Sequence, residues 1–191
     1  MSLRQRVDQA RIAEFLKRLG EQFRHPARLY LVGGSTLVYE GLRQQTIDVD
    51  VVLEADAKVH GEFVKAIRDL KDRLSINVEE ASPGDFIPLP GGYANRHEYI
   101  GRFGQLDVWH FDLYSLALAK IERGRAQDME DVLTLLRVGR IEWERLHQYF
   151  KEILPRMGEH SLRQDPVEFE QNFREVERQW RSKPDVSGET A

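Results

Sequence analysis

Asp48 and Asp50, two acids separated by one valine, are the residues of this chain whose types and spacing best suit chemistry. Because side chains alternate between the faces of a β-strand, a strand would project both carboxylates to one side, about 7 Å apart. Two like charges that close are tolerated in open solvent, or where a divalent cation offsets their repulsion. Magnesium binds a few carboxylates together with phosphate oxygens and water, and such sites align groups for in-line displacement. The pair predicts either a metal-assisted phosphate site or a solvated strand edge.

A turn formed by Gly33, Gly34 and Ser35 precedes these acids and follows a short apolar run at residues 29–32. It would place backbone N–H groups and a hydroxyl between a strand and a helix, where the start of the helix favours anionic groups. Taken alone, such a glycine pair is usually only a turn. Ahead of two acids it is more informative, because the turn offers donors to phosphates and the acids hold the cations that phosphates need.

The elements that must position these residues follow from the hydrophobic pattern. Apolar residues at i, i+3, i+4 and i+7 from Ile12 to Leu19 predict an amphipathic helix, and short β-branched runs between turn residues predict strands. Strands are expected at residues 29–32, 47–53, 75–79, 96–102 and 105–111, and helices at 12–20, 35–41, 63–74, 113–123, 128–136 and within 141–180. This order predicts an α/β (α+β) fold, a small mixed sheet flanked by helices with a C-terminal helical extension.

Composition excludes several classes of protein. The absence of cysteine rules out disulfides, thiol nucleophiles and Cys-ligated zinc, and no Walker A loop or zinc-binding histidine spacing occurs. The sequence has neither an apolar run long enough for a membrane span nor a secretory signal, so we expect a cytoplasmic protein without a membrane partner. Within a net charge of −4, residues 31–119 carry fourteen Asp/Glu against eight Lys/Arg. An acidic region that handles a polyanion needs bridging cations.

The order of strand, Gly-Gly-Ser, short helix and Asp-x-Asp resembles the opening signature of the polymerase-β-type nucleotidyltransferases. Twelve residues lie between Ser35 and Asp48, toward the long end of that spacing. The stretch GLRQQTIDVDVVL is similar to the Arg-x-x-Thr-x-Asp-x-Asp segment of the AbiEii-like and minimal nucleotidyltransferases of prokaryotic toxin–antitoxin and phage-defence systems. LALAKIERGRAQDMEDVLTLL is similar to their helical motif, a Lys followed by Arg-x-x-Asp-x-x-Asp. The resemblance covers about residues 28–137 and implies a nucleotidyltransferase palm sheet.

The superfamily's third carboxylate comes from a later strand that faces the aspartate pair. Asp107, in QLDVWHF, is the best match, because it is the one acid inside a strand-like run after the Pro/Gly-rich loop. The resemblance implies that Asp48, Asp50 and Asp107 bind Mg²⁺ or Mn²⁺, that Asp107 helps to activate the attacking hydroxyl, and that the Gly-Gly-Ser turn binds the triphosphate. The alternative for Asp107 is an ion pair with an arginine such as Arg102.

Four further residues are expected at the nucleotide. The resemblance implies that Lys120 contacts a phosphate and that Asp128 orients Lys120 or an arginine, whereas a plain helix N-cap is the alternative for Asp128. Arg43 and Thr46 are similarly open, since Arg43 would serve the nucleotide or pair with a neighbouring acid.

The resemblance implies an enzyme that transfers a nucleoside monophosphate from an NTP to a protein or RNA acceptor, such as tRNA, with release of pyrophosphate. A cognate toxin or antitoxin would be its protein partner. The alternative is a catalytically weak or inactive antitoxin or regulatory protein of the same fold, which binds its partner through the helical extension. We expect a nucleotidyltransferase-like domain with its N-terminal helix at residues 1–137, the extension at 138–182 and a disordered tail at 183–191.

Overall fold

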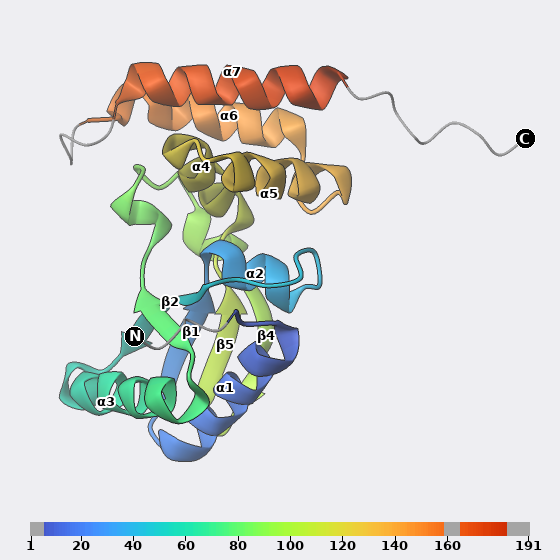
Figure 1. Cartoon of the computed structure of the whole chain (residues 1–191). Coiled ribbons are helices and arrows are strands. Elements are labelled where there is room, and N and C mark those ends of the chain that lie inside the picture. Colours follow the sequence, from blue (N-terminus) through green and yellow to red (C-terminus); the bar gives the residue numbers. More distant parts are fainter. Residues whose placement is uncertain (1–5, 159–164, 183–191) are drawn as a thin grey trace, which may run out of the picture.

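The computed structural model describes residues 6–158 and 165–182, and a five-stranded mixed sheet lies at its centre (Figure 1). The strands are β1 (Ala27–Leu31), β2 (Asp48–Ala55), β3 (Asn77–Glu80), β4 (Glu98–Phe103) and β5 (Leu106–His110). Their order across the sheet is β3-β2-β1-β5-β4. β1 is antiparallel to β2 and parallel to β5, β2 is parallel to β3, and β4 is antiparallel to β5. The expected mixed sheet is confirmed.

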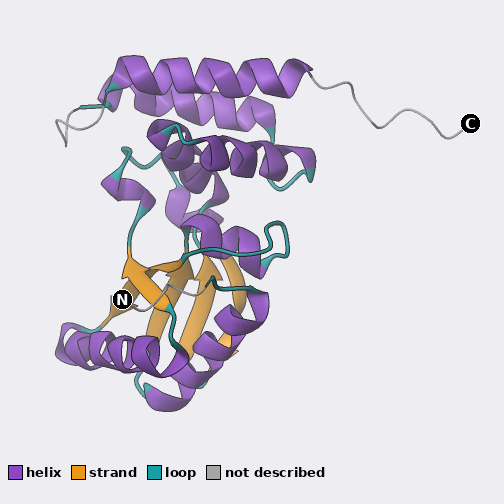
Figure 2. Cartoon of the chain, viewed as in Figure 1, coloured by secondary structure: helices purple, strands orange, loops and turns teal. Residues whose placement is uncertain are grey.

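Helices cover one face of this sheet and extend beyond one of its ends (Figure 2). The α-helices of the described ranges are α1 (Gln9–Gln22), α2 (Gly33–Tyr39), α3 (Ala57–Leu74), α4 (Leu113–Arg123), α5 (Ala126–Arg137), α6 (Trp143–Ile153) and α7 (Pro166–Ser182), with 3₁₀ turns η1 (Pro83–Asp85), η2 (Tyr93–Arg96) and η3 (Leu154–Arg156). α1 and α3 lie beside the sheet, whereas α4 to α7 stack beyond the end where α2 lies (Figure 1). None of the helices in these ranges is long and apolar enough to cross a membrane.

Side-chain alternation along the strands gives the sheet two different faces. Leu29 and Leu31 of β1 and Val49 and Val51 of β2 are buried in one apolar core with the inner faces of α1 and α3, including Phe15. Burial of each such side chain contributes about 1.5–3 kcal/mol. The odd-numbered positions of β1 and β2 therefore fix the register, and the even-numbered positions, which include both aspartates, lie on the opposite face.

α4, α5, α6 and α7 share a second core. Its aromatic residues come mainly from the last two helices, where the rings of Phe150 and Phe173 stack with centroids 3.9 Å apart and Phe169 is fully buried. Helices on both sides of the expected boundary at 137/138 contribute to this core, and the division into two domains stays a prediction. The expected tail at 183–191 lies outside the described residues.

The largest departure from the expected elements concerns α2. This helix was expected to begin at Ser35, but α2 begins at Gly33 after Val32, and the hydroxyl of Ser35 accepts a hydrogen bond from the Asp50 N–H at 2.8 Å. The glycines can enter the helix directly from β1, since Gly33 has a φ of +59°, a left-handed conformation that favours glycine. The serine hydroxyl is thus left to tie α2 to β2.

Candidate active site

Three acids of the site lie on neighbouring strands. Asp48 and Asp50 begin β2, on the face opposite the core, as their spacing predicted. In the parallel register of β2 and β3, Asp48 pairs with Asn77 and Asp50 pairs with Glu79. Register partners on adjacent strands project to the same face. The structure therefore brings Glu79 beside Asp50 and assembles three carboxylates at one edge of the sheet.

Hydrogen bonds and charge couple these three acids. The side-chain amide of Asn77 donates both to Oδ1 of Asp48 and to Oε1 of Glu79, each at 2.7 Å. The pKa of Asp50 is raised to about 6, first because the carboxyl is buried and second because Asp48 carries a like charge. Glu79 adds to the rise, while Arg123 and Lys120 oppose it. Burial and the neighbouring acids therefore raise the pKa of Asp50 by more than Arg123 and Lys120 lower it.

The glycine pair makes room for the acids. A Cβ atom on Gly33 would overlap Oδ2 of Asp50, and one on Gly34 would lie 2.8 Å from Oγ1 of Thr46. Thr46 in turn donates to the backbone carbonyl of Asp48 at 3.1 Å. The glycines are therefore required by close approach of the site residues, in addition to the left-handed φ of Gly33.

Asp107 does not lie beside these acids, so the structure does not bring the expected third carboxylate to the aspartate pair. On β1, Arg28 stands opposite Asp107 of the parallel β5 and opposite Glu54 of the antiparallel β2. Asp107 is therefore level with Glu54, which is four residues, or about 13 Å, along β2 from Asp50. It forms an ion pair with Arg102 at 3.1 Å, the alternative considered for it.

Glu79 was missed because its strand was expected without a neighbour. β2, α3 and β3 form a strand–helix–strand unit, in which the two strands lie parallel and their starts meet the same sheet edge. That order of elements is the signal that would have placed Glu79 beside Asp50.

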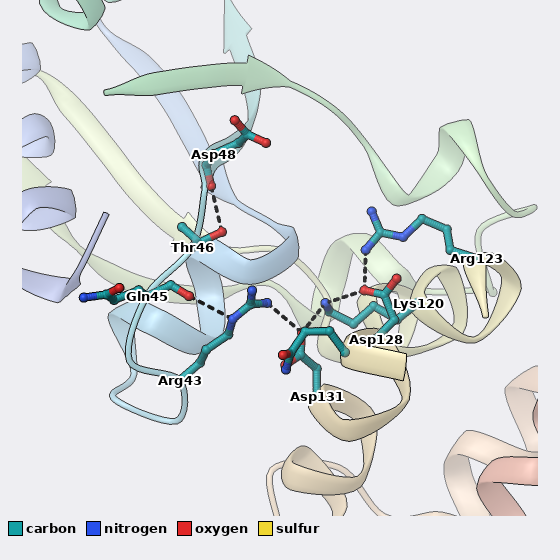
Figure 3. A network of polar contacts seen from close by, with 9 residues as sticks. Arg43, Gln45, Thr46, Asp48, Lys120, Arg123, Asp128 and Asp131 are labelled. Carbon is teal, nitrogen blue, oxygen red and sulfur yellow. Dashed lines mark hydrogen bonds and ion pairs between the residues drawn. The ribbon is translucent and has the colours of Figure 1, made fainter. Parts of the chain in front are cut away.

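A buried network of charges faces the acids from the helical end (Figure 3). Nζ of Lys120 donates to Asp128 at 3.1 Å and to Asp131 at 2.6 Å, and the three side chains are almost completely buried. Arg123 donates to the same oxygen of Asp128 at 2.6 Å, and Arg43 donates to Asp131 at 3.1 Å. The network joins α4 and α5 to the loop that leads into β2.

The alternatives left open for two residues can now be compared with the geometry. Asp128 lies in the first turn of α5, but the N-cap residue of that helix is Arg125. Asp128 instead accepts from Lys120, as the resemblance implied. Arg43 has a neighbouring acid as its partner, Asp131, and donates through Nε to the carbonyl of Gln45 at 2.9 Å. Asp131, the last residue of the Arg-x-x-Asp-x-x-Asp motif, was given no role, although its position three residues after Asp128 places both acids on one face of a helix.

A cavity of about 140 Å³ lies between the acids and the buried network. Gly33, Asp50 and Glu79 line it from the sheet, and Lys120 and Arg123 line it from α4. Its apolar wall comes from the segment after β3 and from α4: Ala81, Pro83, Phe86, Leu116 and Ala119. Gly34 and Ser35 are buried, so within the turn Gly33 is the residue that reaches the cavity. One wall of the cavity is acidic and the other is basic.

The acids suit a cation that completes its coordination elsewhere. Across residues 6–158 and 165–182, no three Asp, Glu or His side chains already enclose a metal site. Asp48, Asp50 and Glu79 nevertheless offer hard oxygen donors on one face, and burial together with the charges of Asp48 and Glu79 raises the pKa of Asp50. Mg²⁺ typically takes one or two carboxylates with water and phosphate oxygens. The donor set fits Mg²⁺ or Mn²⁺ held jointly by these acids and a phosphate ligand.

Comparison with known proteins agrees with this geometry. No curated protein and no solved structure matches the chain. A family model described as "Nucleotidyltransferase of unknown function (DUF6036)" matches residues 10–181, a range that runs from the start of α1 to the end of α7 within one residue and contains both halves of the site. The chain belongs to this nucleotidyltransferase family.

Proposed function

We propose that this protein is a magnesium- or manganese-dependent enzyme that transfers a nucleoside monophosphate from an NTP to a hydroxyl group of a protein or RNA. One observation carries the proposal: Asp50 and Glu79, on the same sheet face as Asp48, line a cavity that Lys120 and Arg123 line from α4. The acidic side suits the cations that accompany a triphosphate, and the basic side suits its phosphate oxygens.

The reaction follows from the groups on the two sides. The acceptor oxygen forms a bond to the α-phosphorus, the bond between the α-phosphorus and the bridging oxygen breaks, and pyrophosphate leaves. A bound divalent cation would neutralise charge on the phosphates. Asp48, Asp50 and Glu79 would hold the cation. Glu79, which is exposed beside the two aspartates, would also accept the proton of the acceptor hydroxyl, the role expected of Asp107.

The buried network acts as the frame of this site. Lys120 is nearly inaccessible and already donates to two carboxylates, so one of its three N–H groups remains for a phosphate oxygen. Asp128 and Asp131 fix its position. Arg43 binds Asp131 of this network, and Thr46 donates to the backbone carbonyl of Asp48. Their part in nucleotide binding is to hold the loop that leads into β2 and so to position Asp48.

The toxin–antitoxin or phage-defence setting rests on the two motif resemblances, and the acceptor is a protein or an RNA on the same basis. An inactive, partner-binding protein has less support. Phe150, Phe169 and Phe173 of the helical extension are buried in its own core and offer no apolar surface to a partner.

Label transfer tests the proposed function. The protein is incubated with Mg²⁺, candidate tRNA and protein acceptors, and NTPs labelled either on the α- or on the γ-phosphate. We expect label on the acceptor from the α-position alone, and none with Asp48→Asn/Asp50→Asn. Equal label with the wild type and the double variant, or label from the γ-position, would contradict the proposal.

A further inference from the structure

Arg123 is a charged residue of the cavity to which neither motif resemblance gives a role. The Arg-x-x-Asp-x-x-Asp segment begins at Arg125, which is exposed at the start of α5. Arg123 lies in the last turn of α4, and its side chain, 26% exposed, lines the cavity together with Asp50 and Glu79. The guanidinium therefore faces the two acids across the space in which a ligand would lie.

Arg123 retains unused hydrogen-bond donors. A guanidinium has five N–H groups, and Nη2 gives one of them to Asp128 at 2.6 Å. Nε is buried and has no hydrogen-bond partner within the described part of the chain. Lys120 differs, since it is 3% exposed and has two acidic partners, and Arg43 differs because it does not line the cavity. Of these three cations, Arg123 has the greatest unused capacity to bind an anion.

Two contacts hold the guanidinium in place. Asp128 binds its edge, and the ring of Phe86 lies under it with 5.4 Å between the ring centroid and Cζ. An arginine over an aromatic face gains cation–π stabilisation, and the contact restricts the plane of the guanidinium. Asp128 and Phe86 come from different segments, so the side chain is ordered before any ligand binds. A preordered donor loses less conformational entropy on binding.

The ligand that fits these donors is a phosphate group. A planar guanidinium matches two phosphate oxygens with parallel hydrogen bonds, which a lysine ammonium cannot do. A neutral ligand would leave the buried donor and the positive charge unused. We infer that Arg123 binds a phosphate group of the nucleotide opposite Asp50, with Phe86 and Asp128 as its positioning residues. This inference rests on the proposed function, because it assumes that a nucleoside triphosphate occupies the cavity.

Equilibrium binding of nucleotides tests the inference. The dissociation constants of a nonhydrolysable NTP and of the matching NMP are measured with Mg²⁺ by titration calorimetry for wild type, Arg123→Gln and Arg123→Lys. Arg137→Gln is the matched control, since Arg137 also has one carboxylate partner, Glu130, and is 31% exposed, but lies away from the cavity. Thermal melting without nucleotide reports folding of each variant.

We expect Arg123→Gln to weaken NTP binding about 10- to 100-fold, the range for a hydrogen bond to a charged group. The preference for NTP over NMP should shrink in this variant. Arg123→Lys should fall between it and the wild type, because lysine keeps the charge but loses the planar fork. Arg137→Gln should match the wild type.

Two results would overturn the inference, and they are distinguishable. If the wild type binds the NTP and Arg123→Gln binds it equally well, Arg123 serves only to pair with Asp128, and the proposed function is untouched. A lowered melting temperature with unchanged NTP binding has the same meaning. If the wild type binds no NTP, the proposed function fails and the inference fails with it.

Discussion

Asp50 on β2 and Glu79 on β3 are direct register partners in parallel strands, and both line the cavity. Their segments are joined by a whole helix, α3, so the sheet alone makes them neighbours. The proximity of a third acid, Asp48, leaves this edge with a local excess of negative charge. A cation that binds at this edge would offset the repulsion between the three carboxylates and so stabilise the folded protein.

Divalent cations should therefore stabilise the folded protein. A ligand that binds only the folded state at about 100 times its dissociation constant adds about 2.7 kcal/mol, which raises the melting temperature of a chain of this size by about 5–10 °C. We expect this rise with Mn²⁺ for the wild type and not for Asp50→Asn, as measured by calorimetry at pH 7.5. Asp69→Asn, on α3, should keep the rise. An equal rise in all three proteins would place the cation elsewhere.

The raised pKa of Asp50 predicts an unusual pH dependence in the absence of metal. Its pKa is about 6 in the folded protein and 3.8 when unperturbed, so between these values the folded state binds more protons than the unfolded state. The contribution of Asp50 to the free energy of unfolding is therefore present below pH 4 and lost as the pH rises through about 6.

The measurement is chemical unfolding in EDTA at pH values from 4.5 to 7.5. The stability of the wild type relative to Asp50→Asn should fall as the pH rises, by on the order of 2 kcal/mol. If the difference in unfolding free energy between the two proteins stays constant over this range, or grows in favour of the wild type, the pKa of Asp50 is not raised in the folded state.

Arg43 and Asp131 should be energetically coupled. Asp131 is 3% exposed and accepts from Arg43, so removal of either partner leaves a buried charge less well satisfied. We expect Asp131→Asn to cost about 2–4 kcal/mol, and the double variant with Arg43→Gln to deviate from additivity by at least about 0.5 kcal/mol. Denaturant unfolding measures all four free energies. The exposed pair Arg137 and Glu130 is the control, and its coupling should be smaller. Strict additivity for the first pair would contradict the network.

Gly33 should be required for the site as well as for the turn. Gly33→Ala and Gly41→Ala both place a side chain at a positive φ, which costs about 1–2 kcal/mol. Only at Gly33 would the new Cβ overlap a carboxylate, that of Asp50, whereas nothing lies within 4 Å at Gly41. We expect both variants to lose stability and Gly33→Ala alone to lose Mn²⁺-dependent NTP binding. Retained binding in Gly33→Ala would show that Asp50 can lie elsewhere.

Hydrophobic patterning predicted the strands and most helices to within a few residues, because periodicity reports which side of an element is buried, although α3 begins at Ala57 and not at residue 63. It also predicted that the two aspartates share a face. Asp112 lies between the strand and the helix expected at 105–111 and 113–123, and its carboxylate caps α4 by accepting from the backbone N–H groups of Tyr114 and Ser115. Features that depend on neighbours within a few residues were therefore accessible from the sequence.

The third carboxylate was not accessible in this way, because it depends on strand order. Asp107 shares its face with Asp50, as alternation predicted, but lies toward the other end of the sheet. The register of β5 against β1 places Asp107 far from Asp50, and the register of β3 against β2 places Glu79 next to it. Neither register can be read from the sequence. Arg123 was missed for a related reason: its role depends on a cavity formed by segments distant in the sequence.

Binding of Mn²⁺ together with a nonhydrolysable NTP tests the central claim most directly, with Glu79→Gln compared with Asp107→Asn. Each variant removes one negative charge from the same face of the sheet, at opposite ends. We predict that Glu79→Gln weakens Mn²⁺ binding, followed by electron paramagnetic resonance, about tenfold or more, and that Asp107→Asn leaves it unchanged. Loss of Mn²⁺ binding in Asp107→Asn with wild-type binding in Glu79→Gln would contradict the site described above.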